Sequence, residues 1–145
     1  MAEYIYIPEQ TVLFGANVLL NGSYPCTKRS VFHQDGSGIF TLRGPSCSNQ
    51  SFARYQVTFN ANIAVPTGGT VGEISVAISE NGENLGQSLA AITPAAVNEY
   101  GNVTSTSYIE VPACCGCPQI AIKNSSSTSE SILVRNANLV ITRIA

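Results

Sequence analysis

The chain has 145 residues, of which 44% are hydrophobic and only 11% charged, and its formal net charge is −2. So little charge excludes a disordered tail, a coiled coil and a salt-bridged helical bundle. The seven Lys and Arg residues are scattered rather than gathered in a stripe, so nucleic-acid binding is not expected. No segment approaches the roughly 18–20 apolar residues of a membrane span. The length fits one domain, and residues 1–8 lack the features of a secretory signal.

Apolar and polar residues alternate along most of the chain, which is the pattern of strands with one buried face. The alternation is clearest over residues 54–65, where the apolar side chains from Tyr55 to Val65 fall on one face. Strands are predicted, in chain order, over residues 11–20, 38–42, 54–65, 71–79, 85–92, 102–111, 119–123 and 131–144. No stretch is amphipathic over a length that a substantial helix needs.

Residue pairs that tolerate positive φ separate these runs. The Asn81-Gly82 pair is the clearest hairpin signal. Turns are also predicted at Asn21-Gly22, Asp35-Gly36, Gly68-Gly69 and Tyr100-Gly101. Residues 123–131 are rich in serine and are predicted to form an exposed loop tip. Eight or nine strands, without a Trp or a long crossover helix, favour an all-β, single antiparallel jelly roll over an immunoglobulin sandwich.

The five cysteines allow three interpretations. Cys114, Cys115 and Cys117 form a cluster, and thiolates at this spacing can share a zinc ion if Cys26 or Cys47 completes the site. Alternatively, Cys26 or Cys47 forms a disulfide with a member of the cluster. In the third interpretation the thiols stay reduced and pack as small hydrophobic residues.

No catalytic arrangement stands out. His33 lies beside Asp35, but no nucleophile accompanies it in a known motif. The chain has no calcium-loop pattern, and Gly68-Gly69 joins two strands rather than preceding a helix. The chain is therefore predicted not to be an enzyme, and no cofactor is expected.

Short motifs span most of the chain. They are Tyr55-Gln56-Val57-Thr58-Phe59, Ile63-Ala64-Val65-Pro66, Gly68-Gly69-Thr70-Val71-Gly72, Ser75-Val76-Ala77-Ile78, Asn81-Gly82-Glu83, and residues 105–111 and 134–141. They resemble the tumour-necrosis-factor-like jelly roll in its bacterial and phage form, and the best match is the C-terminal domain of collagen-like exosporium glycoproteins. The resemblance covers roughly residues 11–145, and its motifs specify a fold rather than a chemistry.

The resemblance implies a homotrimer. In the family, copies meet through aromatic and aliphatic side chains, which here correspond to Tyr55, Phe59, Tyr108, Leu139 and Ile141. Unlike the exosporium proteins, this chain shows no Gly-X-Y stalk, and it looks like the stand-alone form in phage head decoration or head-fibre proteins. The resemblance thus implies a structural virion protein, made in the bacterial host cytoplasm, that binds the major capsid protein or another virion surface protein. The alternative is a spore-surface or cell-surface adhesion or trimerisation module, which could bind carbohydrate or a receptor.

Residues 1–10 form a leader ahead of the jelly roll of residues 11–145. In it, Tyr4, Ile5, Tyr6 and Ile7 alternate aromatic and β-branched side chains before Pro8. One interpretation is a first strand of the domain. The other is a capsid-anchoring arm, which docks on a neighbour by strand addition.

Overall fold

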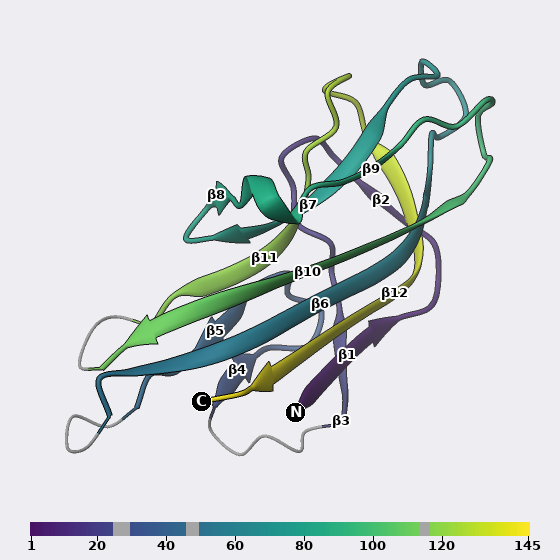
Figure 1. Cartoon of the computed structure of the whole chain (residues 1–145). Helices are drawn as coiled ribbons and strands as arrows, with labels where there is room; N and C mark the ends of the chain where they lie inside the picture. The colour runs from purple at the N-terminus through teal and green to yellow at the C-terminus, as the bar shows by residue number, and fades with distance from the viewer. Residues whose placement is uncertain (25–29, 46–49, 114–116) are drawn as a thin grey trace.

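The computed structural model describes residues 1–24, 30–45, 50–113 and 117–145, which fold into two antiparallel sheets (Figure 1). The strands are β1 (Ala2–Tyr6), β2 (Gln10–Val12), β3 (Asn21–Tyr24), β4 (Val31–His33), β5 (Phe40–Leu42), β6 (Phe52–Ala64), β7 (Ile74–Glu80), β8 (Glu83–Asn84), β9 (Ala90–Ile92), β10 (Gly101–Pro112), β11 (Gln119–Asn124) and β12 (Ile132–Arg143). One short 3-10 helix, η1 (Gly86–Ser88), precedes β9. Within the described ranges, no helix has the length and apolar character needed to cross a membrane.

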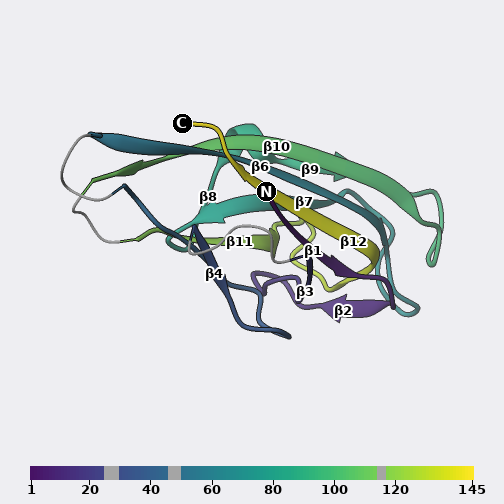
Figure 2. The same ribbon diagram turned by 90° about the horizontal axis from the view of Figure 1, so that it is seen from below.

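The first sheet has the order β10-β6-β12-β1-β3, with β2 also paired to β12. The second sheet has the order β4-β5-β11-β7-β8, with β9 paired to β7. Figure 2 shows β10 and β6 in one layer and β11 and β4 in the other. The long strands β6, β7, β10, β11 and β12 alternate between the two sheets along the chain. This arrangement confirms the predicted single antiparallel jelly roll.

The core lies between the sheets and is built on the strongest sequence pattern. β6 buries every second side chain from Ala53 to Ile63, and β10 pairs with it over twelve residues without a register shift. Tyr55 and Phe59 share one buried cluster with Phe40 of the second sheet. The Tyr55 hydroxyl lies 2.6 Å from the Arg43 carbonyl oxygen and 3.1 Å from that of Ser30. Burial is the main cause of the raised pKa of this phenol.

The predicted hairpin at Asn81-Gly82 is confirmed. Both residues have positive φ, 51° and 88°, and they join β7 to β8. This is the conformation that Asn-Gly favours in a two-residue hairpin loop. The Asn81 side chain also accepts a hydrogen bond from the Gln119 backbone N–H at 3.0 Å, which ties the turn to β11.

Some predicted strands and turns are wrong because local hydrogen bonds favour other backbone conformations. Asn21-Gly22 begins β3 instead of making a turn. Of residues 11–20 only the start is strand. The Gln10 side-chain amide donates to the Leu19 carbonyl at 2.9 Å and accepts the Leu19 backbone N–H at 3.0 Å, so Leu19 bonds a side chain instead of a neighbouring strand. Of residues 85–92 only the end is strand, because the Ser88 hydroxyl donates to the Leu85 carbonyl at 2.7 Å and stabilises η1.

The loop between β11 and β12 is only partly the exposed tip that its serines predict, since Ser127 and Ser129 are exposed but two other polar side chains are buried. Asn124 and Ser126 are each only 1% exposed. The Asn124 amide donates to the carbonyls of Val12 and Glu130, and the Ser126 hydroxyl donates to Asn124 Oδ1 at 2.6 Å. The same hydroxyl accepts the backbone N–H of Ser75 at 3.0 Å. This buried polar cluster replaces water for every group involved and holds the loop against both sheets.

Two buried serines should respond oppositely to the same substitution. The Ser107 hydroxyl is buried and makes no hydrogen bond within the described part of the chain, so Ser107→Ala should raise the free energy of unfolding by about 1 kcal/mol. Ser126→Ala should lower it by about 1–3 kcal/mol, because buried partners lose their bonds. Urea unfolding at one protein concentration measures both. Equal losses in the two variants would contradict this assignment.

Candidate functional site

The outward face of the first sheet is polar, and its charged side chains lie at its margins. Its side chains are Asn102, Thr104, Thr106 and Tyr108 on β10, Gln56, Thr58, Asn60 and Asn62 on β6, and Asn138, Val140 and Thr142 on β12. We call this surface the amide face. At one end of it Arg54 and Glu110 form an ion pair at 3.0 Å. At its β1 side, Glu3 accepts a hydrogen bond from Asn138.

Neighbouring strands are linked across the amide face by side-chain hydrogen bonds. Asn102 donates to Asn60 at 2.9 Å and to Asn62 at 3.1 Å, and Thr104 donates to Asn60 at 2.8 Å. One step along the strands, the hydroxyls of Thr58 and Thr106 lie 3.1 Å apart. Because these polar groups already bond one another, covering the face with a partner would leave few of them unsatisfied.

A bulge in β12 bounds the amide face at its other end. The register with β6 shifts after Arg135, and Asn136 has a φ of 53° and donates its backbone N–H to the Ile7 carbonyl at 3.1 Å. The Arg135 guanidinium lies 3.7 Å from the centre of the Tyr100 ring, and the Tyr100 hydroxyl donates to Glu9. Burial, then the bond to Glu9, raises the pKa of Tyr100 to about 12. These contacts fasten residues 7–9 to the sheet.

β10 is a long strand at the edge of the first sheet. Among the described residues it pairs with β6 alone, so its other edge has no partner strand there. Edge strands are usually protected by shortness, by bulges, by Lys or Pro residues, or by a covering helix or loop. β10 has twelve residues, no register shift and no Lys, and its one charge, Glu110, is paired with Arg54. Its one Pro, Pro112, is its last residue, and the Ser105 hydroxyl donates to the Ser88 carbonyl of η1. The edges of the second sheet are short, with three residues in β4 and two in β8.

Four of the five predicted trimer-interface side chains are corrected. Tyr55, Phe59, Leu139 and Ile141 are at most 1% exposed and fill the core, whereas Tyr108 is 61% exposed on the amide face. The sequence prediction therefore selected strands that contribute to the amide face. In four of the five cases, however, it selected side chains on the opposite face of the strand, which points into the core. The space between the sheets needs large apolar side chains, and these residues supply them.

The anchoring arm predicted for Tyr4, Ile5, Tyr6 and Ile7 is also corrected, since the structure has the alternative, a strand of the domain. β1 lies between β12 and β3 and pairs with both. The Tyr4 ring is 8% exposed and packs 4.7 Å from the rings of His33 and Phe40. Burial, then the charge of Asp35, raises the pKa of Tyr4. Within its own chain, β1 therefore has a partner strand on each edge for its backbone hydrogen bonds.

His33 is a packed strand-end residue. Its ring stacks on Phe40 at 4.2 Å, and its two nitrogens lie 2.9 and 3.2 Å from the carbonyl oxygens of Leu20 and Ile39. Of the candidate metal and disulfide residues, Cys117 is an exposed free cysteine. Cys26, Cys47, Cys114 and Cys115 lie outside the described residues, so neither a disulfide nor a metal site is assigned to them.

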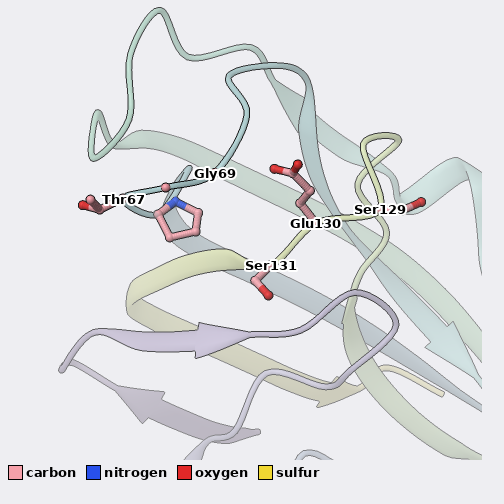
Figure 3. A pocket seen from close by; sticks show the side chains of 7 residues that line it. Thr67, Gly69, Ser129, Glu130 and Ser131 are labelled. Atoms are coloured by element: carbon pink, nitrogen blue, oxygen red, sulfur yellow. The ribbon is translucent and has the colours of Figure 1, made fainter.

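A second candidate site is a depression of about 410 Å³ where two loops meet at one end of the sandwich. We call it the loop-end pocket. Residues 66–69, between β6 and β7, form one wall, and residues 129–131, before β12, form the other. Figure 3 shows the Glu130 side chain extending from its segment toward the loop that carries Gly69. One carboxylate oxygen of Glu130 accepts the Thr70 backbone N–H at 2.8 Å.

No family model matches the chain, and no curated protein matches it by sequence. Among solved structures, the globular domain of the zebrafish complement 1qA protein matches 99% of this chain and 96% of its own, with a TM-score of 0.65 and 11% identity. Eiger TNF from S. frugiperda matches 100% of this chain and 92% of its own, with a TM-score of 0.67 and 12% identity.

The vertex protein P5 of PRD1 also matches 99% of this chain and 96% of its own, at a TM-score of 0.52 and 11% identity. At such identities these matches show the fold alone. The fold is a TNF-like and C1q-like jelly roll.

The role of β1 as a core strand can be tested with one buried and one exposed side chain. Tyr4→Ala should lower the free energy of unfolding by about 3–5 kcal/mol, since it removes a buried ring beside Phe40. Ile7→Ala, at a side chain that is 56% exposed, should change it by less than about 0.5 kcal/mol. Chemical unfolding followed by circular dichroism measures both. An unchanged stability in Tyr4→Ala would restore the arm interpretation.

Proposed function

We propose that this protein is a structural homotrimer whose copies meet through the amide face and the free edge of β10. The observation that carries the proposal is the unpaired edge of the twelve-residue β10, beside a sheet face whose charges lie at its margins. In this arrangement the β10 edge of each copy contacts the amide face of the next copy, which is a head-to-tail contact. Three such contacts related by a threefold axis close into a ring. Tyr108, exposed beside that edge, supplies the large ring that interfaces favour.

The composition supports burial of this surface. A protein with 11% charged residues has few groups whose desolvation would oppose association, and the amide face concentrates Asn and Thr instead. Its hydrogen bonds run between side chains of the same copy, so a partner need only exclude water. The exposed charge pair of Arg54 and Glu110 stands at one end, where it can stay hydrated.

We further propose that the trimer decorates the outside of a tailed-phage capsid, bound to the major capsid protein or another virion surface protein. The likeness of the fold to a PRD1 vertex protein and the sequence resemblance to stand-alone phage head proteins support this. Because β1 is held within its own sheet, attachment falls to the surface of the jelly roll. On the outward side of the second sheet, Phe32 and Ile39 are 62% and 42% exposed and supply an apolar surface for the particle.

Two exposed aromatic residues on opposite sheets make a matched test of the trimer. Tyr108→Glu should reduce the mass in solution from about three chains to the 15.3 kDa of one, because it places a charge in the proposed contact. Phe32→Glu, with an equally exposed side chain on the other sheet, should leave the trimer intact. Light scattering coupled to size exclusion measures both. A monomeric wild-type chain at micromolar concentration would refute the trimer.

The virion role needs a separate measurement. Mass spectrometry and negative-stain images of particles from a lysate should find the wild-type protein on capsids. Phe32→Glu should be a trimer that no longer co-purifies with them. Absence of the wild-type protein from purified particles would contradict the decoration role, and its presence on spores or cell envelopes would favour the surface-adhesion alternative.

A further inference from the structure

We propose that the ion pair of Arg54 and Glu110 continues from one copy to the next, so that three arginines and three glutamates alternate around the threefold axis. We call this arrangement the charge ring. The inference rests on the proposed trimer and names the side chains through which its copies recognise one another. Both side chains lie on the amide face, 43% and 56% exposed, with a nitrogen–oxygen distance of 3.0 Å.

The strand register places the two residues where neighbouring copies meet. Glu110 lies directly opposite Arg54, so the two share one row across the sheet, with Glu110 on the edge strand β10 and Arg54 on β6. In the proposed head-to-tail contact the β10 edge of each copy lies along the amide face of the next, with the strands running along the threefold axis. A rotation about that axis leaves every row at its own height. Glu110 of one copy therefore faces Arg54 of the next.

Both side chains keep bonding capacity for a second partner. A guanidinium carries five N–H donors, and a carboxylate has two acceptor oxygens. Within the described ranges, the hydrogen bond between them uses only Arg54 Nη2 and Glu110 Oε2. The Phe52 ring lies 5.2 Å from the Arg54 guanidinium carbon and supports it from the side. Each Glu110 can thus bond its own Arg54 with one oxygen and the Arg54 of the next copy with the other.

The ring balances its charges. Arg143, a second cation near this end of the sheet, is engaged elsewhere, since its guanidinium donates to Gln50 at 3.1 Å and to the Ala145 backbone oxygen at 3.0 Å. The ring therefore contains equal numbers of positive and negative groups, and an opposite charge separates every like-charged pair. An isolated surface ion pair contributes little to stability, whereas several charges joined in a network contribute more.

The charge ring gives the interface a defined register. In the middle of the amide face the side chains are neutral and bond within their own copy, as Asn102 does with Asn60, so these rows tolerate a shift along the strands. The row of Arg54 and Glu110 does not. A shift by one row would bring Glu110 beside Gln56 of the next copy instead of its arginine. Charged contacts across an interface commonly fix register in this way.

Charge reversal tests the ring in the full chain. Arg54→Glu alone and Glu110→Arg alone each place like charges at all three contacts. Each should raise the concentration at which half of the trimer dissociates about tenfold, since a roughly fivefold loss at each of three contacts multiplies to about a hundredfold in the dissociation constant. Sedimentation equilibrium measures this, and circular dichroism checks that each variant is folded. Glu83→Arg, at an exposed glutamate of the second sheet, is the matched control and should assemble as the wild type does.

Mixing the two reversal variants separates contacts between copies from the pair within each copy. Neither chain regains its own pair on mixing, yet a mixed ring has two attractive contacts and one repulsive contact, whereas either pure trimer has three repulsive ones. We therefore expect mixed trimers at concentrations where each variant alone is monomeric. Native mass spectrometry with one variant labelled with nitrogen-15 detects them. The double variant, Arg54→Glu with Glu110→Arg, should restore the homotrimer.

A neutral variant, Arg54→Gln with Glu110→Gln, covers the case in which a reversal alters the fold. Its trimer should depend less on sodium chloride than that of the wild type, because salt screens the ring. With a trimeric wild type, the charge ring is overturned if the single reversals assemble normally, if their mixture forms no mixed trimers, or if the neutral variant keeps the full salt dependence. A wild-type chain that stays monomeric refutes the proposed trimer itself, and the ring with it.

Discussion

The structure depends on the position of β6 between β10 and β12. Every second side chain of β6 from Ala53 to Ile63 is buried, and the pairing with β10 continues over twelve residues without a shift. A slip of one residue would move all of these side chains to the outer face and send the polar ones inward, so the register is strongly specified. The core, the outward face and the loops at both ends inherit their positions from this pairing.

One consequence is a surface built from amides and hydroxyls. Because Tyr55 and Phe59 must face inward, the residues between them, Gln56 and Thr58, must face outward, and Asn60 and Asn62 follow. Their bonds to Asn102, Thr104 and Thr106 give the sheet a second, side-chain layer of cross-strand contacts. The low charge content of the whole chain and the hydrogen bonds within this face both support the proposed contact with another copy.

A second consequence is the rigidity of the loops at one end. Asn124 and Ser126 bury polar side chains, and each finds partners in backbone groups of neighbouring segments. A buried polar cluster destabilises the fold when some of its groups lack hydrogen bonds, and it favours one defined conformation when all of them are bonded. By fixing the backbone of Glu130, this cluster positions a wall of the loop-end pocket.

The sequence by itself determined the all-β class, the alternation of β6 and β10, and the Asn81-Gly82 hairpin, because each rests on near neighbours in the chain. The TNF-like fold also followed from short motifs. Other features needed the tertiary structure. Period-two patterns show that Tyr55 and Phe59 share a face with one another, but not whether that face meets the core or another copy.

The same limit explains the leader and the serine-rich loop. Tyr4 is buried because β12, more than 130 residues away, offers an edge beside which it packs against Phe40, and nothing local indicates this. Asn124 and Ser126 have the residue types of a loop, and the distant partners Val12 and Ser75 complete the hydrogen bonds that make their burial favourable. Local patterns determined the long strands β6 and β10, whereas long-range partners for backbone and polar groups decided which other segments are buried, because buried hydrogen-bonding groups are nearly always satisfied.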